Sequence, residues 1–208
     1  MCYYVEQKLT RKQAKILFNI GIDDETKYLE GDIINGFSYP NIPIITNDKP
    51  EIITTSFTWG LLPTWNKDLD SRKNTLNARI ETIDNKPSFK NIISNRCLII
   101  ATAFYEWRWF DDKGKKKEKY KINNMDSEMF CFGGLYNRGI NPLTGEPMNT
   151  YTMVTTEANA TMAYIHNHKK RMPIILNRKD ETAWLDSNNN INDFAFPYQS
   201  NLIGFQTT

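Results

Sequence analysis

Short runs of β-branched and aromatic residues, separated by Asn, Asp, Gly and Pro, cover most of this chain and constrain its fold more than any other feature. Such runs are typical of β-strands, and the residues between them are typical of turns. Asp111–Gly114 is a hairpin turn signal, and Asn141–Gly145 marks a second turn. The sequence therefore predicts a mainly antiparallel sheet. Its expected strands are Ile42–Thr46, Ile52–Trp59, Cys97–Trp109, Glu118–Ile122, Met129–Leu135 and Thr150–Thr155.

Signals for helices are fewer than those for strands. Thr10–Gly21 is predicted to form an amphipathic helix, with Thr10 as its N-cap and Gly21 as its stop. Thr155–Tyr164 and Asp180–Leu185 are also expected to be helical. The chain of 208 residues contains no internal repeat and no linker long enough to divide it. We therefore expect one domain over residues 1–208.

Composition and charge exclude some classes of protein. The 26 Lys and Arg are nearly balanced by 24 Asp and Glu, so charge alone does not indicate a nucleic-acid-binding protein. No apolar run reaches the length of a membrane-spanning helix or a signal-peptide core, so we expect a cytoplasmic protein without membrane contact. The three cysteines are odd in number and widely spaced, which predicts reduced thiols rather than disulfides or a paired zinc site.

Cys2 is the residue with the most informative chemistry. Met1 before a small side chain is readily removed, and its loss would leave a cysteine with a free α-amine. An amine with a pKa of about 7.7 to 8 beside a thiol with a pKa of about 8.5 provides two nucleophiles near neutral pH. An aldehyde suits this pair, because the amine forms an imine and the thiolate then closes a thiazolidine ring. The alternative is that Cys2 simply begins an edge strand, whereas Cys97 and Cys131 are expected to be inert core residues.

Two further segments carry polar groups that suit a reactive site. In Asn77–Thr82, Arg79 could bind a phosphate and Asn77 could fix an amide or hydroxyl, although Arg79 could equally form a surface pair with Glu81. Glu106 lies in an aromatic strand, where burial would raise its pKa and make it a proton donor or acceptor near neutral pH. In a half-exposed strand, Glu106 would instead point to water.

A third segment, Ile165–Pro173, contains both histidines of the chain, His166 and His168, together with Arg171. A histidine can transfer protons at physiological pH, and the neighbouring cations can hold phosphates. The His-x-His pair could also bind a metal ion, but no third ligand has a suitable spacing, so we expect no metal site.

Taken together, these segments resemble the SOS response-associated peptidase (SRAP) family, which includes proteins that crosslink to abasic sites in DNA. Any one segment is a weak signal, whereas five in this order, with a cysteine at position two, are specific. The matching segments are Met1–Cys2, Trp59–Trp65, Asn77–Thr82, Phe104–Trp107 and His166–Pro173.

The resemblance implies both a fold and a set of roles. The implied fold is α+β, a single domain with a curved, mainly antiparallel, barrel-like sheet flanked by helices. Cys2 would be the crosslinking nucleophile after loss of Met1. The implied catalytic residues are Cys2, Asn77, Glu106 and His166, with His168 as the alternative histidine. The implied DNA contacts are Arg79, Arg171, Trp65 and Trp59.

The expected activity is that of a self-processing cysteine peptidase of the SRAP type that forms a thiazolidine crosslink with abasic single-stranded DNA in the SOS response. We expect a monomer without cofactor and without an obligatory protein partner. Two alternatives remain open at this stage. One is a cysteine peptidase in which Cys2 and His166 cleave peptides in trans. The other is a non-catalytic module that binds single-stranded DNA.

Overall fold

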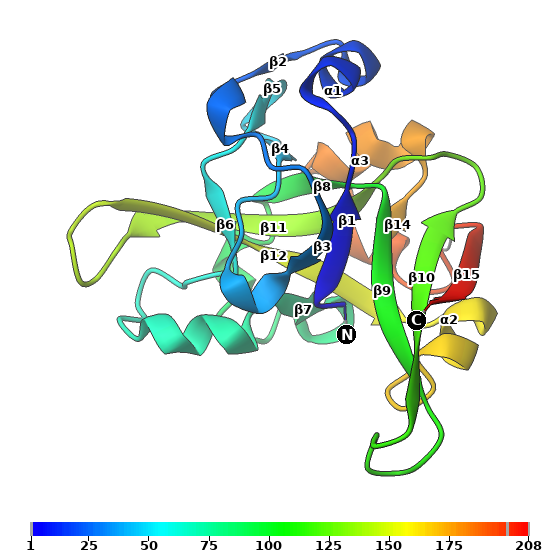
Figure 1. Cartoon of the computed structure of the whole chain (residues 1–208). Coiled ribbons are helices and arrows are strands. Elements are labelled where there is room, and N and C mark those ends of the chain that lie inside the picture. Colours follow the sequence, from blue (N-terminus) through cyan, green and yellow to red (C-terminus); the bar gives the residue numbers. More distant parts are fainter. Residues whose placement is uncertain (1, 199, 208) are drawn as a thin grey trace.

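Two curved sheets pack against each other and form a strongly curved half-barrel (Figure 1). The computed structural model describes residues 2–198 and 200–207. Within these residues the smaller sheet has five strands in the order β15–β10–β9–β1–β3. Their bounds are Leu202–Thr207 for β15, Lys117–Asn124 for β10, Ala103–Trp109 for β9, Tyr4–Gln7 for β1 and Gly31–Asn35 for β3.

The larger sheet has ten strands in the described part of the chain, with a main path β13–β12–β11–β8–β4–β5–β2. β14 pairs with β11, and β6 and β7 both pair with β12. The bounds are Gly21–Ile22 (β2), Ile44–Thr46 (β4), Lys49–Thr54 (β5), Phe57–Trp59 (β6), Asn77–Arg79 (β7), Arg96–Ala101 (β8), Phe130–Ile140 (β11), Pro147–Glu157 (β12), Arg171–Pro173 (β13) and Ile175–Leu176 (β14). Most pairings are antiparallel, while β6 and β7 run parallel to β12, and β2 runs parallel to β5. The predicted α+β fold with a curved, mainly antiparallel sheet is confirmed.

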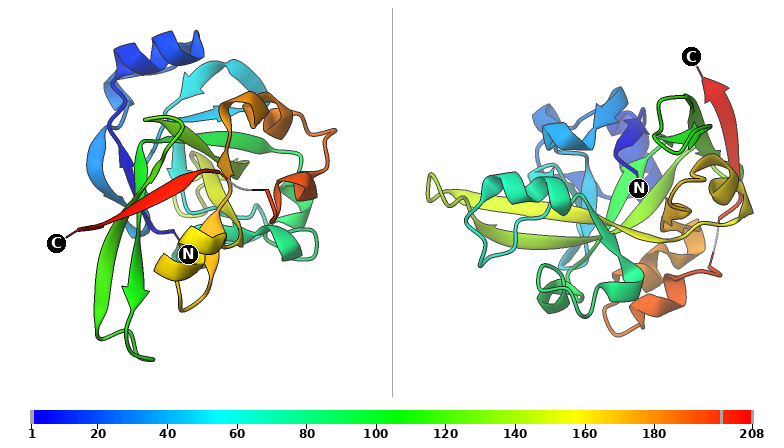
Figure 2. Two further views of the ribbon diagram at one scale, coloured as in Figure 1. Left: turned by 90° about the vertical axis from the view of Figure 1, so that its right-hand side faces the viewer. Right: turned by 90° about the horizontal axis from the view of Figure 1, so that it is seen from below.

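Three α-helices lie outside the sheets in the described residues: α1 (Arg11–Phe18), α2 (Ala160–Ile165) and α3 (Glu181–Leu185). Figure 1 shows α1 and α3 at one end of the molecule and α2 at the other, beside the β9–β10 hairpin. That hairpin projects beyond the rest of the molecule, as the left panel of Figure 2 also shows. No helix among the described residues is long and apolar enough to cross a membrane.

β8 separates two apolar cores. Cys97, Ile99 and Ala101 point into the core between the two sheets, whereas Leu98 and Ile100 point into the core beneath α1 and α3. Successive side chains of a strand point to opposite faces, so an unbroken apolar run is the pattern expected of a strand that is buried on both sides. The predicted core positions of Cys97 and Cys131 are confirmed, since both side chains are fully buried.

The predicted strand Cys97–Trp109 is in fact two strands that belong to different sheets. β8 ends at Ala101 and β9 begins at Ala103, so the chain passes from the larger sheet to the smaller one at Thr102. The backbone N–H of Thr102 donates to the carbonyl oxygen of Glu6 at 2.8 Å. The run of β-branched and apolar residues continues across this position, so its pattern gave no sign of the change of sheet.

Two helix predictions are corrected at their ends. The helix predicted over Thr10–Gly21 begins with a capping box at Thr10, as expected, but ends at Phe18, because Asn19 adopts the left-handed conformation with φ 56°. The helix predicted over Thr155–Tyr164 starts too early, because β12 continues to Glu157 and pairs there with β13. α2 instead begins after Asn159, whose side chain accepts from the backbone N–H of Met162 at 2.9 Å.

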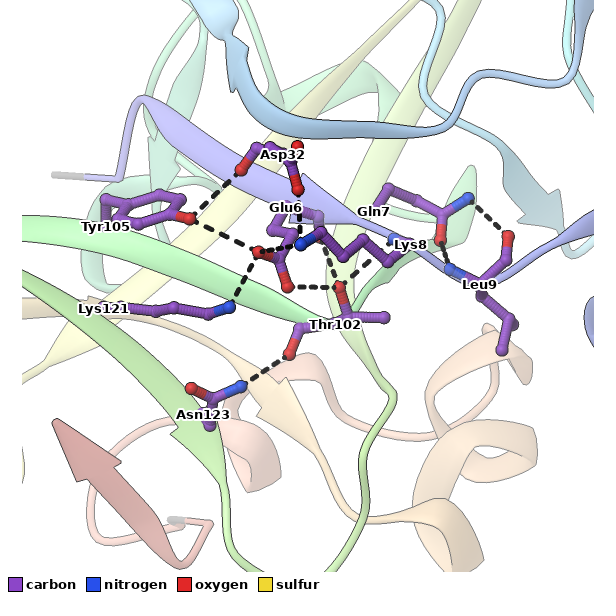
Figure 3. Close-up of polar contacts among 9 residues, drawn as sticks. All are labelled: Glu6, Gln7, Lys8, Leu9, Asp32, Thr102, Tyr105, Lys121 and Asn123. Atoms are coloured by element: carbon purple, nitrogen blue, oxygen red, sulfur yellow. Dashed lines mark hydrogen bonds and ion pairs between the residues drawn. The ribbon is translucent and has the colours of Figure 1, made fainter. Parts of the chain in front are cut away.

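β1 lies between β3 and β9, so Cys2 precedes a central strand and not the edge strand considered as an alternative. Figure 3 shows the polar network that holds β1 in the sheet through the buried Glu6. The Glu6 carboxylate accepts from Lys121 Nζ at 2.7 Å and from Thr102 Oγ1 at 3.0 Å. Tyr105 Oη donates to the same carboxylate at 3.4 Å. These hydrogen bonds satisfy the buried carboxylate and join β1 to other strands of the sheet.

Candidate active site

Cys2 is fully buried, and its backbone is bound by an asparagine from a distant part of the chain. Asn77 Nδ2 donates to the carbonyl oxygen of Cys2 at 2.9 Å. Asn77 is the first residue of β7, which is held in place by its parallel pairing with β12. Asn77 Oδ1 is buried and has no hydrogen-bond partner among the residues that the structure describes. An unsatisfied buried acceptor beside Cys2 is available to a donor on a bound group.

The carboxyl group of Glu106 and the imidazole of His166 form a second pair at this site. Glu106 lies on β9 and His166 follows α2, and Glu106 Oε2 is 3.9 Å from His166 Nε2. Both side chains are buried. Burial raises the pKa of Glu106 to about 7, and burial lowers the pKa of His166 to about 4. At neutral pH, Glu106 is therefore partly protonated and His166 is neutral. The alternative in which Glu106 points to water is wrong, and burial raises the pKa of Glu106 as predicted.

The hydrogen bonds of His166 indicate which nitrogen carries its proton. Nδ1 lies 2.8 Å from the carbonyl oxygen of Arg171 and 3.4 Å from the backbone nitrogen of the same residue. Because a carbonyl oxygen only accepts, the shorter contact places the proton on Nδ1. Nε2 of the neutral ring then carries a lone pair on the side of Glu106. The pair can pass a proton to or from a group bound between the two side chains.

A pocket of about 280 Å³ opens beside this pair. It is lined by aromatic rings and cationic side chains, together with the side chains of Glu106 and His166. The lining residues are Tyr3, Tyr4, Glu106, Trp107, Trp109, Lys117, His166, His168 and Lys169. Aromatic rings suit a sugar or a base, and lysines at the wall suit phosphates.

Cys2 is close enough to this pocket to respond to its charges. Burial raises the pKa of the Cys2 thiol well above its usual range, and the negative charge of Glu106 raises it further. The thiol is therefore neutral until a base removes its proton or the charge of Glu106 is neutralised. The structure thus brings together all four residues that the sequence analysis named as catalytic, and their roles stay predictions.

The four predicted DNA contacts have different positions. Trp65 is 60% exposed and Arg79 is exposed, so both can meet a ligand. Trp59 is fully buried, and its Nε1 donates to the carbonyl oxygen of Leu76 at 2.8 Å. The predicted DNA contact of Trp59 is therefore corrected to a core position, which its apolar neighbours in the sequence could have indicated. Arg171 is also buried.

Arg171 is engaged in a bidentate ion pair with Glu81. Its Nη1 and Nη2 atoms lie 2.7 and 2.8 Å from the two carboxylate oxygens, and Nη2 also donates to the carbonyl oxygen of Thr155 at 2.9 Å. A phosphate would have to compete with Glu81 for this guanidinium. The alternative pair of Arg79 with Glu81 is replaced by this longer-range pair, which joins β13 to the segment after β7.

Most residues that line the pocket were not named as site residues in the sequence analysis, whereas His168 was named there as the alternative histidine. Tyr3, Lys117 and Lys169 line the pocket, and His168 stacks on Trp109 with ring centroids 3.9 Å apart. One of them had a usable signal: a hairpin closed at Asp111–Gly114 places Lys117 opposite Trp109, and this register is observed. The stacking of His168 leaves His166 as the histidine that faces Glu106.

Asn77→Ala is expected to slow the reaction of Cys2 without unfolding the protein. Loss of the hydrogen bond to the Cys2 carbonyl frees the reacting residue to shift, and small displacements of this kind cost about 10- to 100-fold in rate. The measurement is the single-turnover rate of the adduct formation with abasic single-stranded DNA that the resemblance to the SRAP family implies. Asn41→Ala is a matched control, because Asn41 Nδ2 also binds a backbone carbonyl, that of Thr55, at 3.2 Å. Equal rates for both variants would contradict a role for Asn77.

The fold and the site define a class of protein: a half-barrel in which a buried cysteine at position 2 lies beside an amide, a carboxyl group and an imidazole. The sequence pattern of the SOS response associated peptidase (SRAP) family matches residues 1–205, and the chain belongs to this family.

Curated relatives and a solved structure agree with this assignment. The chain is 40% identical over 155 residues to the abasic site processing protein YoqW of Bacillus subtilis, covering 74% of this chain and 66% of the relative. It is 31% identical over 163 residues to the abasic site processing protein HMCES of Gallus gallus, covering 67% of this chain and 47% of that protein. The match thus spans just under two thirds of the bacterial relative and about half of the avian one. A crystal structure of a Bacteroides thetaiotaomicron protein superposes with a TM-score of 0.88 at 29% identity, covering 100% of this chain and 92% of the other.

Proposed function

We propose that this protein captures abasic sites in single-stranded DNA by a covalent bond to Cys2, in the response to DNA damage. The printed names of the curated relatives support abasic sites as the target. The reaction requires the free α-amine of Cys2 and hence prior removal of Met1, which we propose is self-catalysed. Met1 lies outside the described residues. The protein acts as a monomer in this proposal.

The chemistry follows from the two nucleophiles of an N-terminal cysteine. The ring-opened deoxyribose of an abasic site carries an aldehyde at C1′, and the Cys2 amine adds to it to form a carbinolamine. Loss of water gives an imine, and the thiol sulfur then adds to the imine carbon while its proton moves to the nitrogen. The sum is aldehyde plus aminothiol giving a thiazolidine ring and one water. No oxidant, reductant or cofactor is needed.

Glu106 and His166 divide the proton transfers of this sequence. The closed form of the sugar must open first, and the proton of Glu106 passes through Nε2 of His166 to the ring oxygen as it leaves. The carbinolamine then needs an acid to release its hydroxyl as water, and the thiol needs a base. A carboxyl group with a pKa of about 7 can serve in both steps, because each protonation state is populated near neutral pH. Asn77 holds the Cys2 backbone during these steps.

The DNA strand is bound by local contacts in this proposal, since the net charge of the chain is only +2. Trp65 is an exposed ring on which an unpaired base can stack, and the exposed Arg79 can reach a phosphate. Lys117 and Lys169 provide cations at the pocket itself. Stacking on aromatic side chains requires unpaired bases, which favours single strands over duplexes.

The observation that carries the proposal is the position of Cys2, bound by Asn77 and within the electrostatic influence of Glu106, which in turn faces His166. The test is intact mass spectrometry, first of the protein alone and then with an abasic oligonucleotide. We expect a protein lacking Met1 and an adduct that survives heating, with the mass of protein plus DNA minus one water. A confirmed free Cys2 that gives no adduct would defeat the proposal.

Two further measurements, of peptide turnover and of affinity for intact and abasic strands, separate the two alternative functions. Peptide turnover without DNA would indicate a peptidase acting in trans, although a buried thiol with a raised pKa does not favour this activity. Equal affinity for intact and abasic strands, without an adduct, would indicate a non-catalytic DNA-binding module.

A further inference from the structure

An asparagine side chain binds the loop that carries His166 to the backbone of β9. Asn167 Oδ1 accepts from the backbone N–H of Trp109 at 3.0 Å, and Asn167 Nδ2 donates to the backbone carbonyl oxygen of Trp109 at 2.8 Å. One side-chain amide thus satisfies both backbone groups of one residue, as a neighbouring strand would. The two residues are 58 positions apart in the sequence.

This attachment occurs at a part of β9 where, among the described residues, no strand pairs with it on that side. The pairing of β1 with β9 runs from Ala103 to Tyr105, whereas β10 covers the other edge as far as Trp109. The backbone of Trp109 therefore lies beyond the start of β1, on an edge that would otherwise be open. Asn167 occupies this position.

Two further contacts hold the same loop and hairpin together. The ring of His168 stacks on the ring of Trp109, with centroids 3.9 Å apart and planes 16° apart. Arg108 packs over the ring of Tyr164 in α2 and donates to the carbonyl oxygen of Tyr164. The loop from 166 to 170 is itself closed, because the backbone N–H of Lys170 donates to the carbonyl oxygen of His166 at 2.8 Å.

We propose that Asn167 is a positioning residue, which binds the backbone of Trp109 and thereby holds His166 against Glu106. Glu106 and Trp109 belong to the same strand, and His166 and Asn167 are adjacent in the loop. The contact between Asn167 and Trp109 therefore also limits the distance between His166 and Glu106. The role of this geometry in catalysis rests on the proposed function. The attachment itself does not.

The prediction for Asn167→Ala has two parts. Adduct formation with abasic single-stranded DNA should slow by about 10- to 100-fold, because the loop can move His166 away from Glu106. The pKa of His166, held near 4 by burial, should rise towards its usual 6.5 as water reaches the ring. The groups that face His166 are Glu106 of β9, the Arg171 carbonyl of β13, and Lys169 and His168 of its own loop.

The pKa can be measured by NMR, because His166 and His168 are the two histidines of the chain and give separate ring signals. Asn123→Ala is the matched control, since Asn123 Nδ2 donates to the Thr102 carbonyl oxygen at 3.1 Å in the same sheet but away from the pocket (Figure 3). The control should leave both the rate and the His166 titration unchanged. If Asn167→Ala does not fold, Asn167→Gln decides by the same two measurements, because it keeps the amide but displaces it by one methylene.

A wild-type rate together with an unchanged His166 titration in a folded Asn167 variant would overturn the proposal. The result is distinguishable from failure of the proposed function. If the wild-type protein gives no adduct with abasic DNA, the proposed function fails, whereas the titration of His166 in the free protein still tests the attachment.

Discussion

Cys2→Ala is expected to abolish the heat-stable adduct with abasic DNA completely. The variant keeps an N-terminal amine, so it can still form an imine with the sugar aldehyde, but it has no sulfur to close the ring. An imine hydrolyses on heating, and borohydride reduction should trap it. The measurement is denaturing gel electrophoresis after heating, with and without prior reduction. This comparison separates the contribution of the amine from that of the thiol.

Cys97→Ala is the matched control for this experiment. Cys97 is fully buried in the core, and burial raises the pKa of its thiol, so it stays unreactive. The control should form the adduct at the wild-type rate. A heat-stable adduct with Cys2→Ala, or its loss with Cys97→Ala in a folded protein, would contradict the assignment of Cys2 as nucleophile.

Glu106→Gln is expected to slow adduct formation by at least about 100-fold and, at the same time, to stabilise the protein above neutral pH. Gln has nearly the same shape but cannot exchange a proton. The folded protein raises the pKa of Glu106 from its usual 4.5 to about 7, so the folded state binds more protons than the unfolded state between these values. Stability is therefore lost as pH rises through this range, by roughly 3 kcal/mol for a shift of this size. The variant has no such loss.

His166 makes the pH dependence of Glu106→Gln distinctive. Its pKa is lowered from 6.5 to about 4, so the unfolded state binds more protons between these values and stability rises with pH there. In the wild-type protein the two effects have opposite signs and largely offset each other from about pH 4.5 to 6.5. In the variant only the histidine effect remains, so stability should rise with pH over that interval.

Urea denaturation at pH 5 and pH 8 measures both effects. Glu118→Gln on the neighbouring strand β10 is a control that should change neither the rate nor the pH dependence. Equal denaturation midpoints for wild type and Glu106→Gln at pH 8 would contradict a raised pKa for Glu106.

Much of the fold could be predicted from the sequence, because alternation and turn residues are local signals. Strands are observed within all the predicted runs, but Ile52–Trp59 is divided into β5 and β6 and Cys97–Trp109 into β8 and β9. The turn at Asp111–Gly114 is observed. The change of sheet at Thr102 could not be predicted, since residues on both sides of it have the same apolar pattern. Nor could the extent of β12, because threonines near a helix start resemble a cap until their partner strand is known.

The types of residue at the site were predictable, whereas their contacts were not. The resemblance to the SRAP family implied Cys2, Asn77, Glu106 and His166 as catalytic residues, and the structure places them together. Arg171 pairs with Glu81, and Asn167 pairs with Trp109, across sequence separations of 90 and 58 residues. A local sequence pattern cannot predict a contact between residues so far apart in the sequence. Trp59 shows the opposite error, in which a residue of suitable chemistry lies in the core.

The position of β8 has a consequence for how the molecule melts. Its side chains contribute alternately to the two apolar cores. Both cores therefore lose packed side chains if this strand detaches from the sheet. Units that share such a strand lose their packing together, and partial opening that spares one of them is unfavourable. The half-barrel should therefore unfold as one cooperative unit. A destabilising substitution far from the pocket, for example in the core beneath α3, would then also lower the stability of the structure around Cys2.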